Sequence, residues 1–242
     1  MALEKRSETK GKWSTTEFVS LLPILSTLSP KVISRLWRLI SIERIPSRTL
    51  LIEEGKVQDR VFILIEGLLQ LFTHRGTDEA TLGILKPPTF VFAEAVLRDV
   101  SPLASVRTLQ TCCVGYIAVD QARKLFEQER EFARILINDL MANWRSMLQE
   151  TKNARTRTGI QRLIAWVLAM QGGAETPSEI MLPYDKGILA SRLGVAPATL
   201  SRDFARLARL GVTVRRRKLE IRDASQLRKM TTIDESNTPP VP

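Results

Sequence analysis

The chain has 242 residues, of which 44% are hydrophobic and 26% are charged, a composition typical of soluble globular proteins. This length is sufficient for two domains. No apolar run approaches the roughly 20 residues that a membrane-spanning helix needs. The polar first 18 residues lack the apolar core of a secretory signal. Cys112 and Cys113 are the only cysteines, and adjacent cysteines rarely pair, so we expect no disulfide framework and a cytoplasmic location.

The net charge of +10 is concentrated in the last third of the chain. Residues 152–230 contain sixteen Lys and Arg against six Asp and Glu, whereas the remaining residues contain twenty of each sign. A basic segment often forms only a solvated face. Segregation of this kind nevertheless favours a nucleic-acid partner over a generally basic surface.

The first half of the chain changes from helical to strand-like patterning. We expect residues 1–17 to form a loose N-terminal arm and residues 18–42 to form short helices broken by two prolines. Short runs rich in Val, Ile, Leu and Phe follow, separated by glycines such as Gly55 and Gly67. This spacing predicts a β-roll of the jelly-roll or cupin-like type within residues 18–128.

Helical patterning returns after the strands. Asp120 is a suitable N-cap for a short helix that ends near Phe126. Residues 129–153 contain no Pro or Gly and carry a broad apolar stripe, which predicts a helix of about 25 residues, or roughly 37 Å. Because this helix is apolar on more than one side, we expect it to mediate dimerisation as well as to pack on the roll, without forming a strict coiled coil. The residues expected at the dimer interface are Phe132, Leu136, Leu140, Trp144, Met147 and Leu148.

Residues 154–230 contain the strongest motif, "LASRLGVAPATLSRDFARLARLG". A helix-turn-helix needs a small residue where the helices cross and a residue that tolerates left-handed backbone in the turn. Ala190 and Gly194 meet these needs, and the second helix is expected over residues 199–210. An ordinary helical hairpin is the alternative. The alternating basic segment "VTVRRRKLEIRD" that follows favours a winged helix-turn-helix.

The order of β-roll, long helix, helix-turn-helix and basic hairpin resembles the Crp–Fnr family of bacterial transcription regulators. The resemblance covers roughly residues 18–225, and in the first half it rests on "LLIEEG" and "VFILIEGLLQLF". It implies an α+β fold in which a β-roll, a long dimerisation helix and a C-terminal winged helix-turn-helix follow one another. It also implies homodimers whose second helices enter successive major grooves of double-stranded DNA at an inverted repeat. Regulators of this type usually also contact RNA polymerase.

The resemblance assigns candidate DNA contacts. Ser201 and Arg202 match the family's Ser-Arg pair on the recognition helix, and an arginine fork can bond O6 and N7 of guanine. Many members carry a base-reading glutamate where this chain has Ala198, which leaves the operator sequence open. The predicted base contacts are Ser201, Arg202, Ala198 and Thr199. The predicted contacts to the DNA backbone are Arg192, Arg206 and the hairpin residues Arg215, Arg216, Arg217 and Lys218, for which a solvated hairpin tip is the alternative.

The family's cyclic-nucleotide binders differ from this chain at the residues that hold the ligand. Phe92 and Ala93 stand where those members carry Gly-Glu for the ribose. Pro102-Leu103 or Leu103-Ala104 stands where Arg-Ser would hold the phosphate. We therefore expect no binding of cAMP or cGMP in the usual way.

The chain contains few residues that could bind an iron–sulfur cluster or a haem. Two cysteines cannot supply the four thiolates of an iron–sulfur cluster, and Cys112 and Cys113 are expected to pack on opposite faces of a strand. His74, the only histidine, lies in a predicted polar hairpin turn, where a solvated side chain is expected rather than a haem ligand. No effector, cofactor or metal site is assigned, and a haem or another small ligand in the roll stays an alternative.

Three other functional classes are alternatives to a specific regulator. An enzyme is not expected, because one histidine and no Gly-rich phosphate loop leave no catalytic constellation. An interaction protein built on the same roll would not require the helix-turn-helix. A sequence-independent DNA-binding protein remains the alternative that substitution of Arg202 tests. Residues 231–242 are expected to form a disordered tail.

Overall fold

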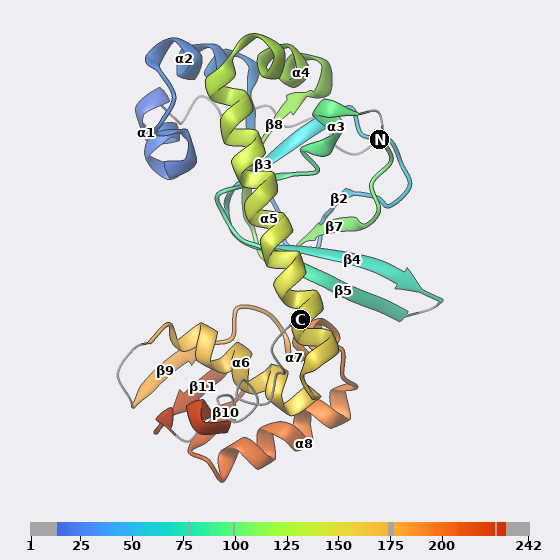
Figure 1. Ribbon diagram of the computed structural model, residues 1–242, viewed down its shortest axis with the longest axis vertical. Helices are drawn as coiled ribbons and strands as arrows, with labels where there is room; N and C mark the ends of the chain where they lie inside the picture. Colours follow the sequence, from blue (N-terminus) through green and yellow to red (C-terminus); the bar gives the residue numbers. More distant parts are fainter. Residues whose placement is uncertain (1–13, 77, 99, 174–176, 226, 231–242) are drawn as a thin grey trace, which may run out of the picture. The chain divides into compact units, whose positions relative to one another are not determined.

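The computed structural model describes residues 14–76, 78–98, 100–173, 177–225 and 227–230 (Figure 1). The chain divides into two compact units, Met1–Met147 and Leu148–Pro242. Most of the predicted arm and all of the predicted tail, residues 231–242, lie outside the described residues. The end of the predicted arm is helical, because helix α1 begins at Thr15 after a capping box formed by Ser14 and Glu17.

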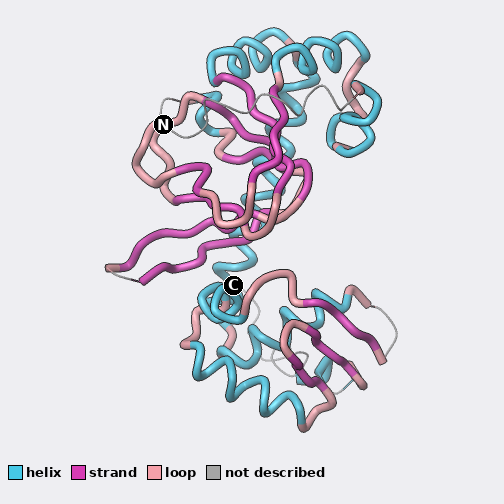
Figure 2. Tube along the Cα trace, turned by 180° about the vertical axis from the view of Figure 1, so that it is seen from behind, coloured by secondary structure: helices cyan, strands magenta, loops and turns pink. Residues whose placement is uncertain are grey.

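The first unit begins with α1 (Thr15–Leu21), the 3-10 helix η2 (Pro23–Leu25) and α2 (Pro30–Leu39), as the proline-broken apolar pattern predicts. Two antiparallel four-stranded sheets follow (Figure 2). One sheet has the order β1–β8–β3–β6, formed by Ser41–Ile45, Cys112–Ala118, Arg60–Glu66 and Thr89–Val91. The other has the order β2–β7–β4–β5, formed by Leu50–Ile52, Ser105–Thr108, Leu69–Arg75 and Asp78–Leu85. The predicted β-roll is confirmed.

Strand β3 explains how the sheets and helices share one core. Its apolar run "VFILI" is buried on both faces. Phe62 and Leu64 belong to a cluster that contains residues of both sheets, whereas Val61 and Ile63 pack in a second cluster with residues of α1, α2, α4 and α5. The alternation of a strand therefore divides one apolar run between the interior of the roll and a helical layer.

Three helices complete the first unit: α3 (Glu94–Leu97), α4 (Val119–Gln128) and α5 (Arg130–Thr156), which continues into the second unit. The predicted N-cap of α4 was wrong. The helix is preceded by Ala118 as N-cap, and Asp120 lies in its first turn. An acidic residue in the first turn still stabilises the helix, because it interacts favourably with the positive end of the helix dipole. Asp120 therefore indicated the start of the helix, although it is not the N-cap.

Helix α5 has two apolar faces, and only one of them is exposed. Phe132 and Leu136 are buried in the core of the first unit, so the prediction that they lie at a dimer interface was wrong. Leu140 packs partly against the same core. The exposed apolar residues of this helix are Ile137, Met141, Trp144, Met147 and Leu148.

A buried carboxylate fixes α5 to the edge of the first sheet. Asp139 accepts a hydrogen bond of 2.9 Å from the backbone N–H of Phe90 and one of 3.3 Å from the hydroxyl of Thr89. Asn143, one turn along the helix, donates to both Asp139 and Thr89. Burial raises the pKa of Asp139 above its ordinary value, although these hydrogen bonds oppose the shift.

The second unit contains α6 (Gly159–Gln171), β9 (Ser178–Met181), α7 (Lys186–Arg192), α8 (Pro197–Ala208), β10 (Val212–Arg215) and β11 (Lys218–Ile221). Gly172, with φ of 62°, ends α6 in the left-handed conformation that favours glycine. The three strands form a sheet of order β10–β11–β9. Across the described part of the chain, no helix is both long and apolar enough to span a bilayer.

Candidate nucleic-acid interface

Helices α7 and α8 form a helix-turn-helix with a small apolar core. The turn, residues 193–196, contains Gly194 with φ of 62°, as its predicted role requires. Ala190 is 1% exposed, and the N–H of Val195 donates to its carbonyl over 3.0 Å. Leu189 and Leu200 are buried with it. A larger side chain at the buried position of Ala190 would have to displace these neighbours, which is why a small residue stands there.

Helix α8 begins earlier than predicted. Its first residue is Pro197, and it ends at Ala208 rather than near Leu210. Proline is favoured at the first helical position because its missing N–H has no intrahelical partner there. The shift of two residues does not change which side chains share a face.

The polar outer face of α8 carries the predicted base-reading residues. Ala198, Ser201 and Arg202 are exposed, and Thr199 is half-buried. The hydroxyl of Ser201 donates to the carbonyl of Pro197 over 3.1 Å, and Arg202 donates to the hydroxyl of Thr199 over 3.2 Å. Both bonds lie on the exposed face of α8. Ser201 and Arg202 can therefore exchange them for hydrogen bonds to DNA at little cost in free energy.

The inner face of α8 contains one charged residue. Asp203 is only 5% exposed, and its carboxylate lies 3.6 Å from the guanidinium of Arg206. Asp203 stands at a position where an apolar residue would normally face the core, and it pairs locally with Arg206 instead. Arg206 itself is exposed, as expected for a residue directed to the DNA backbone.

The basic hairpin has the predicted form. Residues Val212 to Arg215 pair antiparallel with Lys218 to Ile221, which places Arg216 and Arg217 in a two-residue turn. Arg216 has a φ of 55°, a left-handed backbone conformation that is uncommon for residues other than glycine, asparagine and aspartate.

The four cations of the hairpin differ in their partners. The side chain of Arg217 donates to the carbonyl of Leu182 over 3.0 Å. Lys218 forms an ion pair with Glu179 on β9. Arg215 and Arg216 are exposed, and neither has a hydrogen bond or ion pair from its side chain to the described part of the chain. The charge available to a polyanion is therefore greatest at these two arginines.

Arg192 has a different position from the one predicted. Its guanidinium donates to the carboxylate of Glu150 over 2.6 Å and to the hydroxyl of Tyr184 over 2.8 Å. Burial lowers the pKa of Arg192, but its interactions with Tyr184 and Glu150 outweigh burial and raise the pKa above its ordinary value. Since both nitrogens of its fork are engaged inside the unit, we withdraw Arg192 as a contact to the DNA backbone.

A second arginine holds the turn of the helix-turn-helix, and the sequence analysis missed it. Arg162 on α6 donates to the carbonyl of Leu193 over 2.8 Å and to the carbonyl of Arg157 over 2.6 Å. It therefore joins the turn to the chain that follows α5. Nothing in the local sequence of Arg162 indicates these backbone partners.

Two family models match the chain. Residues 42–129 match the cyclic nucleotide-binding domain, and residues 161–230 match the Crp-like helix-turn-helix domain. Together they correspond to the roll and to the winged helix-turn-helix just described. The chain belongs to the Crp–Fnr family of transcription regulators.

Solved structures of Crp–Fnr regulators share the fold. A CooA variant from Carboxydothermus hydrogenoformans superposes with a TM-score of 0.71 at 16% identity, covering 87% of this chain and 95% of the other. FixK2 from Bradyrhizobium japonicum gives a TM-score of 0.68 at 14% identity, covering 79% and 96%. A Crp/Fnr regulator from Thermus thermophilus gives a TM-score of 0.66 at 16% identity, covering 79% and 98%. No curated protein sequence matches the chain.

The two cysteines of this Crp–Fnr protein pack as the alternation of strand β8 predicts. Cys112 faces the cluster between the sheets, and Cys113 faces the cluster beneath the helices. Both are buried and free of disulfides. Burial raises the pKa of Cys113 to about 11 and also raises the pKa of Cys112, so both thiols stay protonated at neutral pH.

The single histidine lies in a strand rather than in the turn predicted for it. His74 pairs with Glu79 in the β4–β5 ladder, and the hairpin turn follows at Gly76. Its ring is exposed and makes an edge contact with Phe72, with 5.6 Å between ring centroids. The described residues contain no group of three or more His, Cys, Asp or Glu side chains arranged for a metal ion.

The residues that the sequence resemblance aligns with the family's ligand-binding positions are Phe92, Ala93 and Leu103. Phe92 has a φ of 53°, and its side chain packs against the cluster between the sheets. Ala93 is buried and Leu103 is 87% exposed. The position that resembles the family's ligand-binding Gly-Glu is therefore occupied by a bulky aromatic side chain and a methyl group.

Proposed function

We propose that this Crp–Fnr regulator binds an inverted-repeat site in double-stranded DNA as a homodimer and reads its sequence with helix α8. The observation that carries the proposal is the exposed face of α8, where Ala198, Ser201 and Arg202 stand clear of the core. Arg202 offers the bidentate donor that recognises O6 and N7 of guanine. Ala198 offers only a methyl group, which suits contact with the methyl group of a thymine.

The hairpin supports the second half of the proposal. Arg215 and Arg216 place two exposed charges at its tip. Contacts between such cations and phosphates add affinity for any DNA sequence, because every base pair presents the same backbone. Arg206, exposed on α8, is assigned the same role.

The exposed apolar face of α5 supports the homodimer. Ile137, Met141, Trp144 and Leu148 follow one another at intervals of four, three and four residues. This spacing is that of the a and d positions of a coiled coil, which bury themselves against a second helix. The broad apolar stripe of α5 also includes residues that are buried in the core of the first unit, such as Phe132 and Leu136. The regular spacing is seen only among the exposed residues.

The proposed regulator does not hold a cyclic nucleotide in the family's usual way. Arg107, the nearest arginine in the following strand, donates to Gln70 and to Glu79 over 2.8 Å in each case. Its guanidinium also lies 4.4 Å from the ring centre of Phe72. Arg107 is thus already committed within the sheet and does not replace the missing phosphate-binding arginine. Contact with RNA polymerase and a cytoplasmic location complete the proposal, which assigns no catalytic role to the chain.

Selection from a random DNA library tests the proposal. The purified full-length protein, without an added effector and at a stated salt concentration, is expected to enrich an inverted repeat. Its half-sites should be centred about one helical turn, roughly 34–36 Å, apart. Retention of DNA without enrichment of any sequence, lost as salt rises, would instead indicate the sequence-independent alternative.

A further inference from the structure

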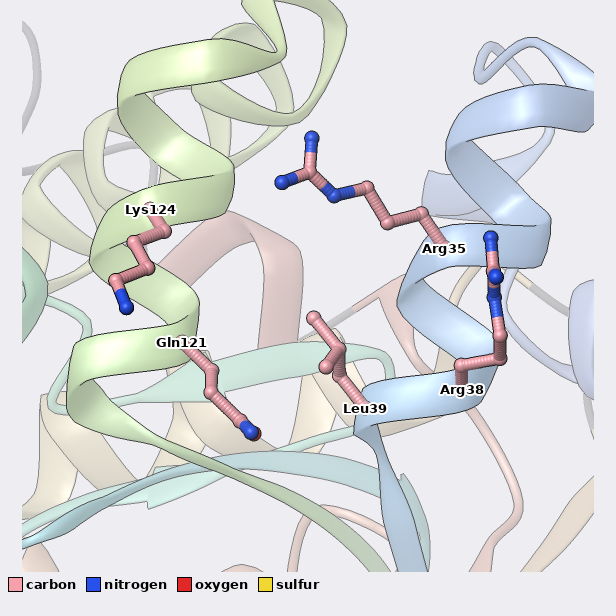
Figure 3. A pocket seen from close by; sticks show the side chains of 5 residues that line it. All are labelled: Arg35, Arg38, Leu39, Gln121 and Lys124. Carbon is pink, nitrogen blue, oxygen red and sulfur yellow. The ribbon is translucent and has the colours of Figure 1, made fainter.

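The cleft between α2 and α4 in the first unit does not bring its cations together. It has a volume of about 420 Å³, and the basic side chains that line it are Arg35, Arg38 and Lys124 (Figure 3). Arg38 extends along α2, and Arg35 and Leu39 lie between it and Lys124. Arg35 also has an acidic partner within the unit. The second unit contains a closer arrangement of opposite charges, centred on the buried carboxylate of Asp203.

Asp203 is an acid on the buried face of α8. The other buried residues of this helix, Leu200, Phe204 and Leu207, are all apolar. A Cβ placed on Gly159, the first residue of α6, would lie 3.9 Å from Oδ2 of Asp203. The carboxylate therefore lies beside the first turn of α6, where the unpaired N–H groups and the helix dipole favour negative charge. This position explains how the core accommodates an acid.

Gly159 also brings the first turn of α6 close to the helix-turn-helix. A Cβ at this residue would lie 2.7 Å from Cγ1 of Val195, well inside van der Waals contact. Arg162, about one turn further along α6, donates to the carbonyl of Leu193. The start of α6 thus contacts the turn of the helix-turn-helix through Gly159 and Arg162, and it contacts α8 through Asp203.

The second oxygen of the Asp203 carboxylate faces Arg206. Oδ1 lies 3.6 Å from Nη1 of Arg206, which is three residues further along α8 and exposed. Within the described residues the Arg206 side chain has no other partner, so its Nε and Nη2 stay available to an outside acceptor. A long side chain normally loses rotamer freedom when it binds, and that loss weakens binding. The buried carboxylate restricts the guanidinium before DNA arrives.

We propose that Asp203 is a positioning residue that holds Arg206 for contact with a DNA phosphate. This inference rests on the proposed function, in which Arg206 contacts the DNA backbone. A guanidinium has donors on more than one edge, so the carboxylate can keep one edge while phosphate oxygens take another. An apolar residue in place of Asp203 would fill the core but would leave Arg206 unrestrained. The acid therefore contributes to DNA binding rather than to stability.

Two substitutions of Asp203 in the full-length protein test this role. Asp203→Asn keeps the size of the side chain and removes its charge, whereas Asp203→Leu supplies an apolar residue. The matched control, Asp185→Asn, removes the same charge from an exposed residue of the same unit. Thermal unfolding of each variant gives its stability and identifies a temperature at which all of them are folded.

Fluorescence anisotropy with the site selected from the random library measures DNA binding by each variant, alone and combined with Arg206→Ala. Both Asp203 variants should bind about threefold more weakly in each half-site, or roughly tenfold for the dimer, because Arg206 must then be ordered on binding. The control should lose no affinity. In the Arg206→Ala background, the Asp203 substitutions should cause no further loss.

The double variants separate positioning from a structural role. A loss that persists in the Arg206→Ala background would show that Asp203 acts on the fold of α8, and would overturn the proposal. A lower thermal midpoint with unchanged DNA affinity would do the same, provided that Arg206→Ala itself weakens binding. An Arg206→Ala variant that binds as tightly as wild type would instead refute the backbone contact in the proposed function, and with it the positioning role.

Discussion

The guanidinium of Arg192, on the first helix of the helix-turn-helix, lies 2.6 Å from the carboxylate of Glu150, near the end of α5. The same guanidinium bonds the hydroxyl of Tyr184, which also accepts a hydrogen bond of 3.0 Å from the indole N–H of Trp166. Four residues from α5, α6, α7 and the segment before α7 therefore form one chain of polar contacts. Arg192 is at its centre, with a side chain only 22% exposed.

Replacement of Arg192 by Ala is expected to destabilise the second unit by about 1–3 kcal/mol, because Glu150 and Tyr184 would lose a partner while still partly buried. Denaturant unfolding of the variant checks the value. Arg209→Ala, at an exposed position of the same unit, is the control and should change stability by less than about 0.5 kcal/mol. An unchanged unfolding midpoint for the Arg192 variant would show that the polar chain contributes nothing.

The two faces of α5 predict opposite effects of substitution. Met141→Glu places a charge in the exposed apolar face and should convert the dimer to monomers with little loss of monomer stability. Ser146→Glu adds the same charge at an exposed position off the Ile137–Leu148 spacing and should leave the dimer intact. Sedimentation equilibrium distinguishes these outcomes, and a Met141→Glu protein that stays dimeric would refute the proposed interface.

Phe132, by contrast, is expected to act through the core. Its ring packs edge-on against Phe90, with 6.0 Å between centroids, and is 1% exposed. Phe132→Ala should lower the free energy of unfolding of the first unit by about 3–5 kcal/mol. Folded molecules of this variant should still associate, which sedimentation at low temperature can measure. Loss of association without loss of stability would return Phe132 to the interface.

Asp139 predicts a pH dependence of stability. Its native pKa is raised, so the native state binds this proton more strongly than the unfolded state does. Stability therefore falls as pH rises from the unfolded pKa, about 3.9, through the higher native value. Asp139→Asn keeps an acceptor for the N–H of Phe90 but does not titrate, so it should gain stability relative to wild type across that window. Urea unfolding at a series of pH values measures the difference, and parallel pH curves for the two proteins would contradict the assignment.

The hairpin arginines predict a change in salt dependence. Arg216→Ala should weaken binding to every DNA sequence alike and reduce the slope of log K against log salt by about one for each hairpin engaged. Arg98→Ala, an exposed substitution in the other unit, should change neither. Fluorescence anisotropy at several salt concentrations gives both slopes. A loss confined to one DNA sequence would mean that Arg216 reads bases.

Local patterns predicted the elements that depend on neighbouring residues. The strand alternation at Cys112 and Cys113 placed the two thiols on opposite faces correctly. The requirement for a small residue and a left-handed turn identified Ala190 and Gly194. The start of α8 was missed by two residues, because Pro197 was not recognised as a favourable first helical residue.

Contacts between distant segments could not be predicted in this way. The stripe on α5 shows that several faces are apolar, but it does not show which face the unit's own core covers, and Phe132 was misassigned for that reason. Glu150 lies 42 residues from its partner Arg192, and Leu193 lies 31 residues from its partner Arg162. A basic residue in a basic segment is predicted from the sequence to contact DNA. Only the fold shows that a carboxylate already pairs with it, as Glu150 does with Arg192.

The affinity of the Arg202→Ala variant for a selected site and for random DNA, at one salt concentration, tests the reading of sequence by α8 most directly. Loss of the guanine contact should cost about 1–3 kcal/mol in each half-site. This loss should appear at the selected inverted repeat, whereas affinity for random DNA should change little. An equal loss on both DNAs would show that Arg202 binds only the backbone and would contradict sequence recognition by this face of the helix.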